Sequence, residues 1–133
     1  MAGTPKPADL RSVLWTATAP PAPPSEPLRG DVRADVAVVG GGYTGLSTAL
    51  HLAERGVDVV LIEAQDAGFG ASGRNNGQVI PTYSRQNPDD VVRELGQEAG
   101  ERLNGWVGGT AAMVFDLIRK HDIDCDAAQE GWL

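Results

Sequence analysis

Residues 35–63 read DVAVVGGGYTGLSTALHLAERGVDVVLIE, and the expected fold follows from this stretch. Its opening residues, 35–39, are mostly apolar and β-branched, as in a strand buried in a parallel sheet. After a run of glycines, apolar residues recur at spacings of three and four, which predicts a helix from about residue 44 to 55. Gly56 stands where a helix often ends on a left-handed residue. A second apolar run, residues 57–62, completes the pattern of a βαβ unit with parallel strands.

The turn between the first strand and the helix carries the motif Gly40-x-Gly42-x-x-Gly45, which is typical of dinucleotide-binding proteins in this context. Gly40 permits a sharp turn, Gly42 leaves room for a pyrophosphate, and Gly45 lets the helix lie close to the sheet. The N–H groups and the dipole of the first helical turn would then hold the phosphates, without a lysine or arginine. The sequence therefore predicts an α/β fold with a Rossmann-like FAD/NAD(P)-binding βαβ unit, followed by helices.

Glu63 follows the second strand, 18 residues after Gly45. A carboxylate in this position accepts hydrogen bonds from a ribose diol and repels a 2′-phosphate, which disfavours NADP. The alternative is a solvated glutamate at the end of an ordinary strand. The motif and its context favour the ribose-binding role.

The loop at residues 68–78, GFGASGRNNGQ, distinguishes FAD from NAD. Its glycine N–H groups and polar side chains are suited to wrap a pyrophosphate and a ribityl chain and then run beside a flavin. A mobile surface loop is the alternative, but long glycine-rich loops are usually functional or disordered. For Tyr43, two roles are open. Its side chain covers the glycine turn at residues 40–42, called the phosphate turn below, or it packs at the start of the helix.

The chain as a whole is expected to have two parts. Residues 1–33, rich in proline, predict an extended N-terminal arm, and residues 34–133 the N-terminal part of an oxidoreductase domain. Asn87 is a predicted helix cap before Pro88, and a longer helix is expected over residues 97–121. One apolar stripe of that helix comprises Leu103, Trp106, Val107, Thr110, Ala111, Val114, Leu117 and Ile118. Its glycines at 105, 108 and 109 suggest close packing, and residues 131–133 resemble the start of a strand.

Composition narrows the function classes. A hydrophobic fraction of 41% predicts a substantial core, and a net charge of −7 argues against nucleic acids and anionic membrane surfaces as partners. The single cysteine, Cys125, excludes an intrachain disulfide and fits a reducing compartment.

No apolar run approaches the roughly 20 residues of a membrane span, so we expect a cytoplasmic protein with no integral membrane segment. His51 and His121 lack neighbouring ligands in the sequence, so no metal site is expected.

Several segments together resemble the D-amino-acid oxidase superfamily of FAD-dependent oxidoreductases, and within it the gamma-glutamylputrescine oxidase-like group. The similar segments are residues 38–47, Glu63, residues 70–78, 83–85 and 123–126, and the leader around Trp15. The resemblance implies FAD as cofactor and oxidation of a C–N bond in a small amine or amino acid. No general base is required of the protein if the substrate amine arrives neutral, and the catalytic residues are unknown. Trp15, Trp106 and Trp132 are interpreted as core or docking aromatics.

Cofactor contacts carry over by position, and the resemblance assigns them to the phosphate turn, the second strand end and the glycine-rich loop. The residues so assigned are Gly40, Gly42, Thr44, Gly45, Glu63, Ala64, Ala71, Ser72, Asn75, Asn76, Gly77 and Gln78. Tyr43, at the start of the helix, and Arg74, in the loop, are further candidate contacts from their positions in the sequence.

Length is the main departure from the family, because similar enzymes are much longer than 133 residues. Two strands do not make a parallel sheet covered on both faces, so we expect a fragment or truncated product that binds FAD weakly and shows no turnover. The substrate stays open among gamma-glutamylputrescine, D-amino acids, glycine and sarcosine, and so does the electron acceptor. Two other functions are open: an NAD-dependent dehydrogenase and a non-catalytic nucleotide-binding module.

Overall fold

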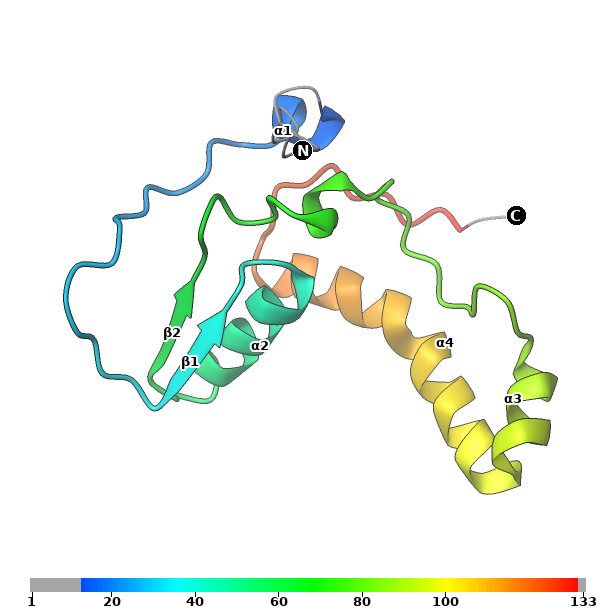
Figure 1. Cartoon of the computed structure of the whole chain (residues 1–133). Coiled ribbons are helices and arrows are strands. Elements are labelled where there is room, and N and C mark those ends of the chain that lie inside the picture. The colour runs from blue at the N-terminus through cyan, green and yellow to red at the C-terminus, as the bar shows by residue number, and fades with distance from the viewer. Residues whose placement is uncertain (1–12, 132–133) are drawn as a thin grey trace, which may run out of the picture. The chain divides into compact units, whose positions relative to one another are not determined.

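The computed structural model describes residues 13–131, and Figure 1 shows their course. The chain divides into two compact units, one ending at Asn76 and one beginning at Gly77.

The first unit contains the expected strand, helix and strand. Strand β1 (Val36–Val39), helix α2 (Tyr43–Ala53) and strand β2 (Val59–Ile62) follow one another, and the strands pair in parallel. The register runs from Val36 opposite Val59 to Val39 opposite Ile62. Helix α2 lies along one face of the strand pair (Figure 1). The order of elements and the parallel pairing are therefore as predicted from the sequence.

The boundaries of these elements differ by a few residues from the expected ones. Strand β2 begins at Val59, because the Val57 N–H turns back to donate to the Leu52 carbonyl. Helix α2 begins at Tyr43 and ends at Ala53, and the turn after it closes on Gly56, whose φ is +76°. The left-handed residue expected at Gly56 is thus confirmed.

The core of the described chain is small. Between residues 13 and 131, Val91 is the one buried hydrophobic side chain, with 3% exposure. Side chains of β1 alternate between half-buried and exposed, and Val39 is 84% exposed. The substantial core predicted from composition is therefore wrong for these residues. The physical reason is that a strand pair with one covering helix buries one face and leaves the other open.

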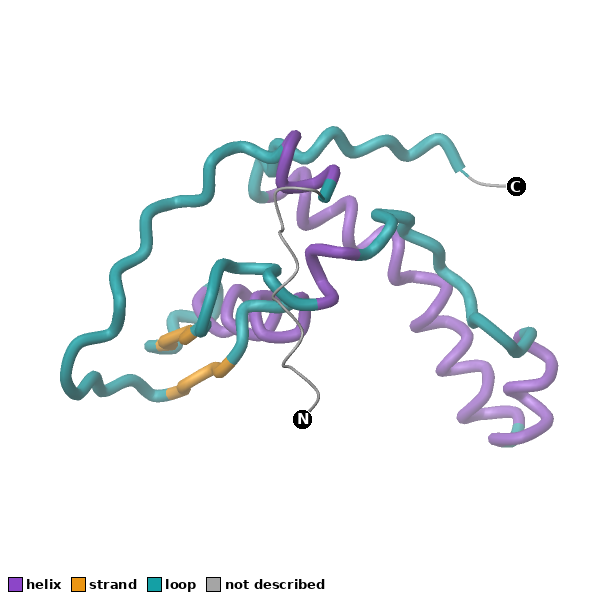
Figure 2. The backbone as a smooth tube through the Cα atoms, turned by 45° about the horizontal axis from the view of Figure 1, so that its top comes forward, coloured by secondary structure: helices purple, strands orange, loops and turns teal. Residues whose placement is uncertain are grey.

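The proline-rich arm is in part a helix. Helix α1 (Leu14–Thr18) was not expected, and it ends where the Ala19 N–H donates to the Trp15 carbonyl before Pro20. From residue 19 to 35 the chain has no helix or strand, as Figure 2 shows, and the extended arm stays a prediction. The rest of that prediction, at residues 1–12, lies outside the described residues.

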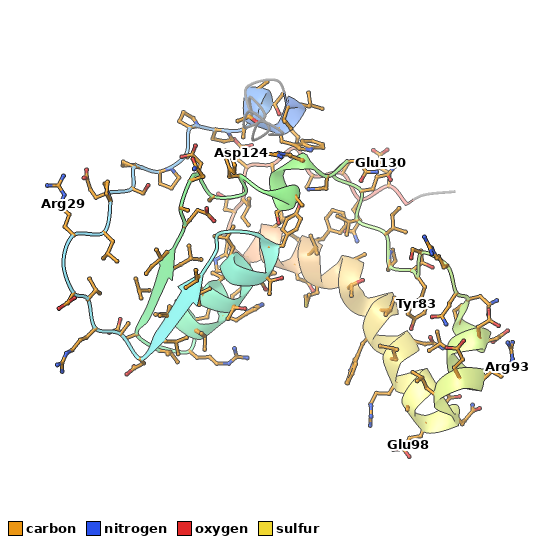
Figure 3. All side chains as sticks on the ribbon, viewed as in Figure 1. Arg29, Tyr83, Arg93, Glu98, Asp124 and Glu130 are labelled. Carbon is orange, nitrogen blue, oxygen red and sulfur yellow. The ribbon has the colours of Figure 1, made fainter. Side chains whose placement is uncertain are left out.

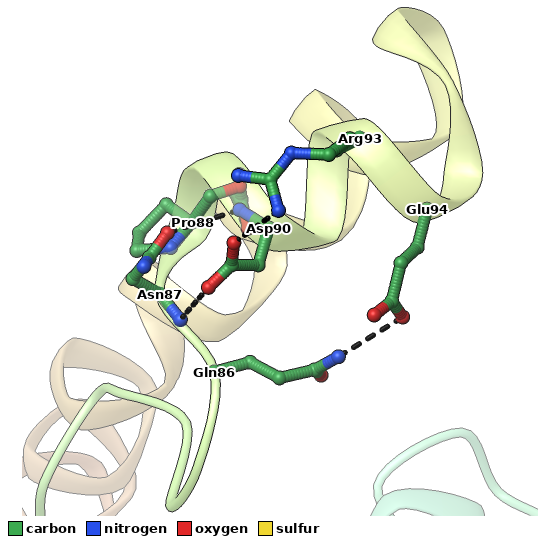
Figure 4. A network of polar contacts seen from close by, with 7 residues as sticks. Gln86, Asn87, Pro88, Asp90, Arg93 and Glu94 are labelled. Atoms are coloured by element: carbon green, nitrogen blue, oxygen red, sulfur yellow. Dashed lines mark hydrogen bonds and ion pairs between the residues drawn. The ribbon is translucent and has the colours of Figure 1, made fainter.

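The second unit is a helical hairpin. Helix α3 (Pro88–Leu95) begins at the predicted cap: the Asn87 side chain accepts from the Asp90 N–H at 2.9 Å, and Asp90 accepts from the Asn87 N–H (Figure 4). Arg93 contacts Asp90 at 2.6 Å, and Gln86 donates to Glu94 at 3.0 Å. Such a capping box satisfies N–H groups that the first helical turn leaves unpaired.

Helix α4 (Gln97–Lys120) contacts α3 through Gly100, which is buried. A Cβ on Gly100 would come 2.5 Å from the Val92 Cα. Tyr83 (Figure 3) donates from its hydroxyl to Asn104 at 2.8 Å, and Asn104 donates to the Pro88 carbonyl at 3.0 Å. These contacts tie the segment before α3 to α4.

Two expectations for α4 need correction. An added Cβ at Gly105, Gly108 or Gly109 meets nothing within 4 Å, so the close packing expected of these glycines belongs to Gly100 instead. Trp106 is 66% exposed and Thr110 is exposed, so neither lies on the less exposed stripe. The other predicted members of the stripe are half-buried: Leu103, Val107, Ala111, Val114, Leu117 and Ile118.

After α4 the described chain has no further strand or helix. Gly131 is not part of a strand, and Trp132 and Leu133, the rest of the predicted strand start, lie outside the described residues. None of the helices in residues 13–131 is both long enough and apolar enough to cross a membrane.

Candidate dinucleotide site

The phosphate turn has the geometry that its glycines predict. Gly40 adopts φ +103°, and its N–H donates to the Ile62 carbonyl at 2.8 Å, so the chain leaves β1 by a sharp turn. A Cβ on Gly45 would lie 1.9 Å from the Gly40 carbonyl oxygen. Because that distance is far below contact, the helix can approach the strand only with glycine at this position.

Helix α2 begins beside the turn without a capping side chain of its own. Gly42 is the N-cap residue, so no side-chain oxygen of that residue can cap the first-turn N–H groups. These groups carry the positive end of the helix dipole. The arrangement provides the donors that a pyrophosphate requires.

Glu63 lies at the end of β2 and is bound to the turn. Its Oε2 accepts from the Gly41 N–H at 2.6 Å, and its Oε1 accepts from the Gln65 N–H at 3.0 Å. These backbone donors, Gly41 first and then Gln65, lower the pKa of Glu63 below its ordinary value of 4.5. The carboxylate is therefore ionised at neutral pH, and each oxygen keeps acceptor capacity for a further hydrogen bond. A merely solvated strand-end glutamate does not describe this geometry.

The glycine-rich loop is fixed against the same turn. The Gly68 N–H donates to the Gly41 carbonyl at 2.8 Å, and within the loop the Gly73 N–H donates to the Gly68 carbonyl at 2.9 Å. A short 3₁₀ helix, η2 (Ala71–Arg74), follows. Its Ser72 hydroxyl accepts from the Tyr43 N–H at 3.0 Å, so a side chain from the loop caps α2.

Asn75 adds a second link between the loop and the start of α2. Its amide donates to the Tyr43 hydroxyl at 2.7 Å and also to the Ser72 carbonyl. Tyr43 is 64% exposed, so it contacts the loop and does not insert into a core. A Cβ on Gly42 would come 2.9 Å from the Ser72 hydroxyl, which shows how closely the loop approaches the turn.

The structure therefore gathers part of the assigned set into one cluster. Gly40, Gly42, Tyr43, Gly45, Glu63, Ser72 and Asn75 take part in it directly. Thr44 lies in the first turn of α2, and Ala64 and Ala71 are exposed neighbours of cluster members. The Arg74 guanidinium stacks on the Phe69 ring, 5.3 Å from its centroid. Asn76 follows Asn75, whereas Gly77 and Gln78 belong to the second unit.

Sequence reasoning missed two participants. Gly41 both donates to Glu63 and accepts from Gly68, although it is the variable position of the glycine motif. Trp15 donates from its indole Nε1 to the Asn75 carbonyl at 2.6 Å. The triple glycine and the tryptophan next to a proline-rich segment were the available signals, but neither specifies a partner.

Two other reactive side chains belong to different segments of the chain. His51 contacts Glu54 at 3.3 Å on the surface of α2, and Cys125 is exposed. Within the part of the chain that the structure describes, no three His, Cys, Asp or Glu side chains gather as a metal would require.

The cluster fits the ADP half of a dinucleotide. It offers an ionised carboxylate for a ribose diol and a helix N-terminus for the pyrophosphate, while the Ser72 hydroxyl occupies the space that Gly42 was predicted to leave open. The hydrogen bond from the Gly41 N–H to Glu63 joins the turn to the end of β2, and that from the Tyr43 N–H to Ser72 joins the start of α2 to the glycine-rich loop.

Comparison with known proteins agrees with this geometry. The chain is 44% identical over 115 residues to gamma-glutamylputrescine oxidoreductase of Escherichia coli K12, covering 86% of this chain and 27% of that protein. It is 41% identical over 112 residues to the probable oxidoreductase OrdL of Rhizobium meliloti, covering 84% of this chain and 26% of the relative. The chain thus spans about a quarter of the length of these relatives.

No solved structure matches the chain. The family model described as FAD dependent oxidoreductase (DAO) matches residues 35–133, which is most of the chain and includes the whole phosphate turn, Glu63 and the glycine-rich loop. The chain therefore belongs to the DAO family of FAD-dependent oxidoreductases.

Proposed function

We propose that this chain binds FAD and forms the N-terminal part of an enzyme that oxidises a C–N bond of an amine or amino acid. The observation that carries the proposal is the ionised Glu63 carboxylate held at the glycine turn by the Gly41 N–H at 2.6 Å. The family assignment supports FAD over NAD, and the similarity to gamma-glutamylputrescine oxidoreductase supports an amine substrate of that kind.

Different parts of the cluster would contact different parts of FAD. Glu63 would accept hydrogen bonds from the adenosine ribose, and the first-turn N–H groups of α2 would bind the pyrophosphate. Loop residues from Ala71 onward would line the cofactor toward the flavin, which supplies the hydride acceptor when it is bound. The proposed contacts are Gly40, Gly42, Tyr43, Thr44, Gly45, Glu63, Ala64, Ala71, Ser72, Arg74, Asn75, Asn76, Gly77 and Gln78.

The wider assignments stay predictions. We place FAD binding in residues 34–133, with residues 1–33 as an arm, and the protein in the cytoplasm. The chain spans about a quarter of its relatives, so we expect weak FAD binding and no turnover from these 133 residues alone.

The test is an equilibrium titration of the purified chain with FAD, followed by the change in flavin absorbance and fluorescence. We expect weak but saturable FAD binding by the wild-type chain, and a Kd for FAD that is about tenfold to a hundredfold higher in Glu63→Ala, which loses a charged hydrogen-bond acceptor. Glu26→Ala, an exposed glutamate in the segment before β1, is the matched control and should bind as the wild type does.

Three outcomes would contradict the proposal. A chain that binds NAD but not FAD is better described as part of a dehydrogenase. A chain that binds adenine nucleotides without preference for FAD is better described as a nucleotide-binding module. Equal FAD binding by the wild type and Glu63→Ala would remove Glu63 from the site.

A further inference from the structure

Helix α1 is attached to the loop that covers the candidate site. Trp15 donates from its indole N–H to the Asn75 carbonyl at 2.6 Å, a link between residues 60 positions apart in the chain. Helix α1 also lies against η2. It has five residues and buries none of them, so a helix this short depends on contacts such as the one with η2.

Asn75 connects Trp15 to the start of α2 through hydrogen bonds. The same residue that accepts from Trp15 through its carbonyl donates through its amide to the Tyr43 hydroxyl at 2.7 Å. Its amide also donates to the carbonyl of Ser72, whose hydroxyl accepts from the Tyr43 N–H. Trp15 is therefore one end of a hydrogen-bonded chain that reaches the first residue of α2.

Glu63 and the glycine turn depend less on η2, because the loop residue that bonds to the turn, Gly68, lies outside η2 and donates to the Gly41 carbonyl. Glu63 is held by the backbone of Gly41 and Gln65, and the turn is held by β2 through the Gly40 N–H. Loss of the Trp15 hydrogen bond would thus loosen η2 while leaving the carboxylate and the glycine turn as they are.

We propose that Trp15 is a positioning residue for the flavin half of the cofactor: by fixing η2, it raises affinity for FAD relative to ADP. This inference rests on the proposed function, in which the loop serves the flavin side and Glu63 with the turn serves the ADP side. Trp15 lies outside residues 35–133, the stretch that the family model matches.

The test compares FAD and ADP binding by the full chain and two variants, with calorimetric Kd values for each nucleotide. Trp15→Phe keeps an aromatic ring and removes the N–H donor. One net hydrogen bond corresponds to a Kd change of roughly threefold to tenfold, and we expect this change for FAD, with ADP altered less than about twofold. Trp106→Phe, which changes an exposed tryptophan of α4 in the same way, should leave both Kd values unchanged.

Amide hydrogen exchange provides a second readout that needs no ligand. We expect faster exchange in the peptide covering residues 68–76 of Trp15→Phe and at the Tyr43 N–H that Ser72 caps, with unchanged exchange in β2. Far-ultraviolet circular dichroism establishes that the variant keeps its helices.

The possible failures are distinguishable. A wild-type chain that binds neither FAD nor ADP overturns the proposed function and this inference together. Wild-type binding of both nucleotides, with FAD and ADP weakened equally in Trp15→Phe, overturns the inference alone, because it indicates general destabilisation. An unchanged FAD affinity of Trp15→Phe, with unchanged amide exchange at residues 68–76, also overturns the inference alone.

Discussion

At the scale of single residues, Glu63 shows what a sequence does and does not reveal. Its place after the second strand was predictable from spacing, and so was its charge. Its partner, the Gly41 N–H, was not, because a hydrogen bond from a backbone group depends on how two turns approach in space. The same holds for Ser72, whose hydroxyl caps a helix that begins 29 residues earlier. Residue type and spacing predicted the candidate site, and the three-dimensional contacts show which of its members touch one another.

The lowered pKa of Glu63 predicts how stability depends on pH. A carboxyl whose folded pKa lies below its unfolded value stabilises the fold above the unfolded value, and this contribution is lost as the pH falls through the folded pKa. We therefore expect the stability difference between wild type and Glu63→Gln to be constant near neutral pH and to shrink below the ordinary value of 4.5. Thermal unfolding at a series of pH values measures it. Glu26→Gln is the control, and a difference that persists in strong acid would contradict the assignment.

Gly45 predicts a second single-residue effect. A Cβ here would overlap the Gly40 carbonyl oxygen at 1.9 Å, so Gly45→Ala must displace α2 from β1. Overpacking of this kind costs about 1–3 kcal/mol, and we expect that loss in urea unfolding, together with weaker FAD binding. Gly105→Ala is the comparison, since nothing lies within 4 Å of its added Cβ. Equal stabilities of the two variants would show that the turn tolerates a side chain.

At the scale of elements, a helix with a start signal in its own sequence was predictable, whereas helix α1, which has no such signal and contacts η2, was not. Asn87, Pro88 and Asp90 encode the beginning of α3 within four residues, and the structure forms that capping box. Helix α1 has no such signal. Its five residues are helical next to η2, and a contact over 60 positions cannot be read from local sequence. The boundaries of β2 were overestimated because apolar residues continue into the turn before Val59.

The glycines of α4 provide a prediction at this scale. Gly100 faces Val92 of α3, and a Cβ there would come 2.5 Å from the Val92 Cα, whereas Gly108 has open space. Gly100→Ala should therefore destabilise the second unit by about 1–3 kcal/mol through overpacking. Gly108→Ala should stabilise it by about 1 kcal/mol, because alanine favours the helix. Circular dichroism during urea unfolding compares the two, and the same sign for both would contradict the described contact between α3 and α4.

At the scale of the whole molecule, composition was a poor guide. The hydrophobic fraction of 41% suggested a substantial core, yet in residues 13–131 Val91 is the one buried hydrophobic side chain. The order of strands and helices follows from sequence periodicity, but burial depends on how many layers cover the sheet. Here two strands have one helix along them, and Val39 is 84% exposed.

A chain with so little buried surface should depend strongly on its ligand. Binding to the folded state alone stabilises it by about 2.7 kcal/mol when the ligand is at 100 times its Kd. We expect FAD to raise the unfolding temperature with increasing concentration, and to slow amide exchange mainly within residues 36–76. Glu63→Ala should need higher FAD concentrations for the same rise. Slowed exchange confined to the second unit would contradict the proposed site.

The parallel register of β1 and β2 has a consequence for the order of folding. The hairpin of α3 and α4 joins neighbours in sequence, and its capping box closes over four residues, so its nucleus forms at a small entropic cost. Val36 and Val59 can pair only after the whole intervening crossover has been ordered. Refolding should therefore gain most of its helical signal early, and the nucleotide site should mature last, because its two halves come from the ends of that late-forming strand pair.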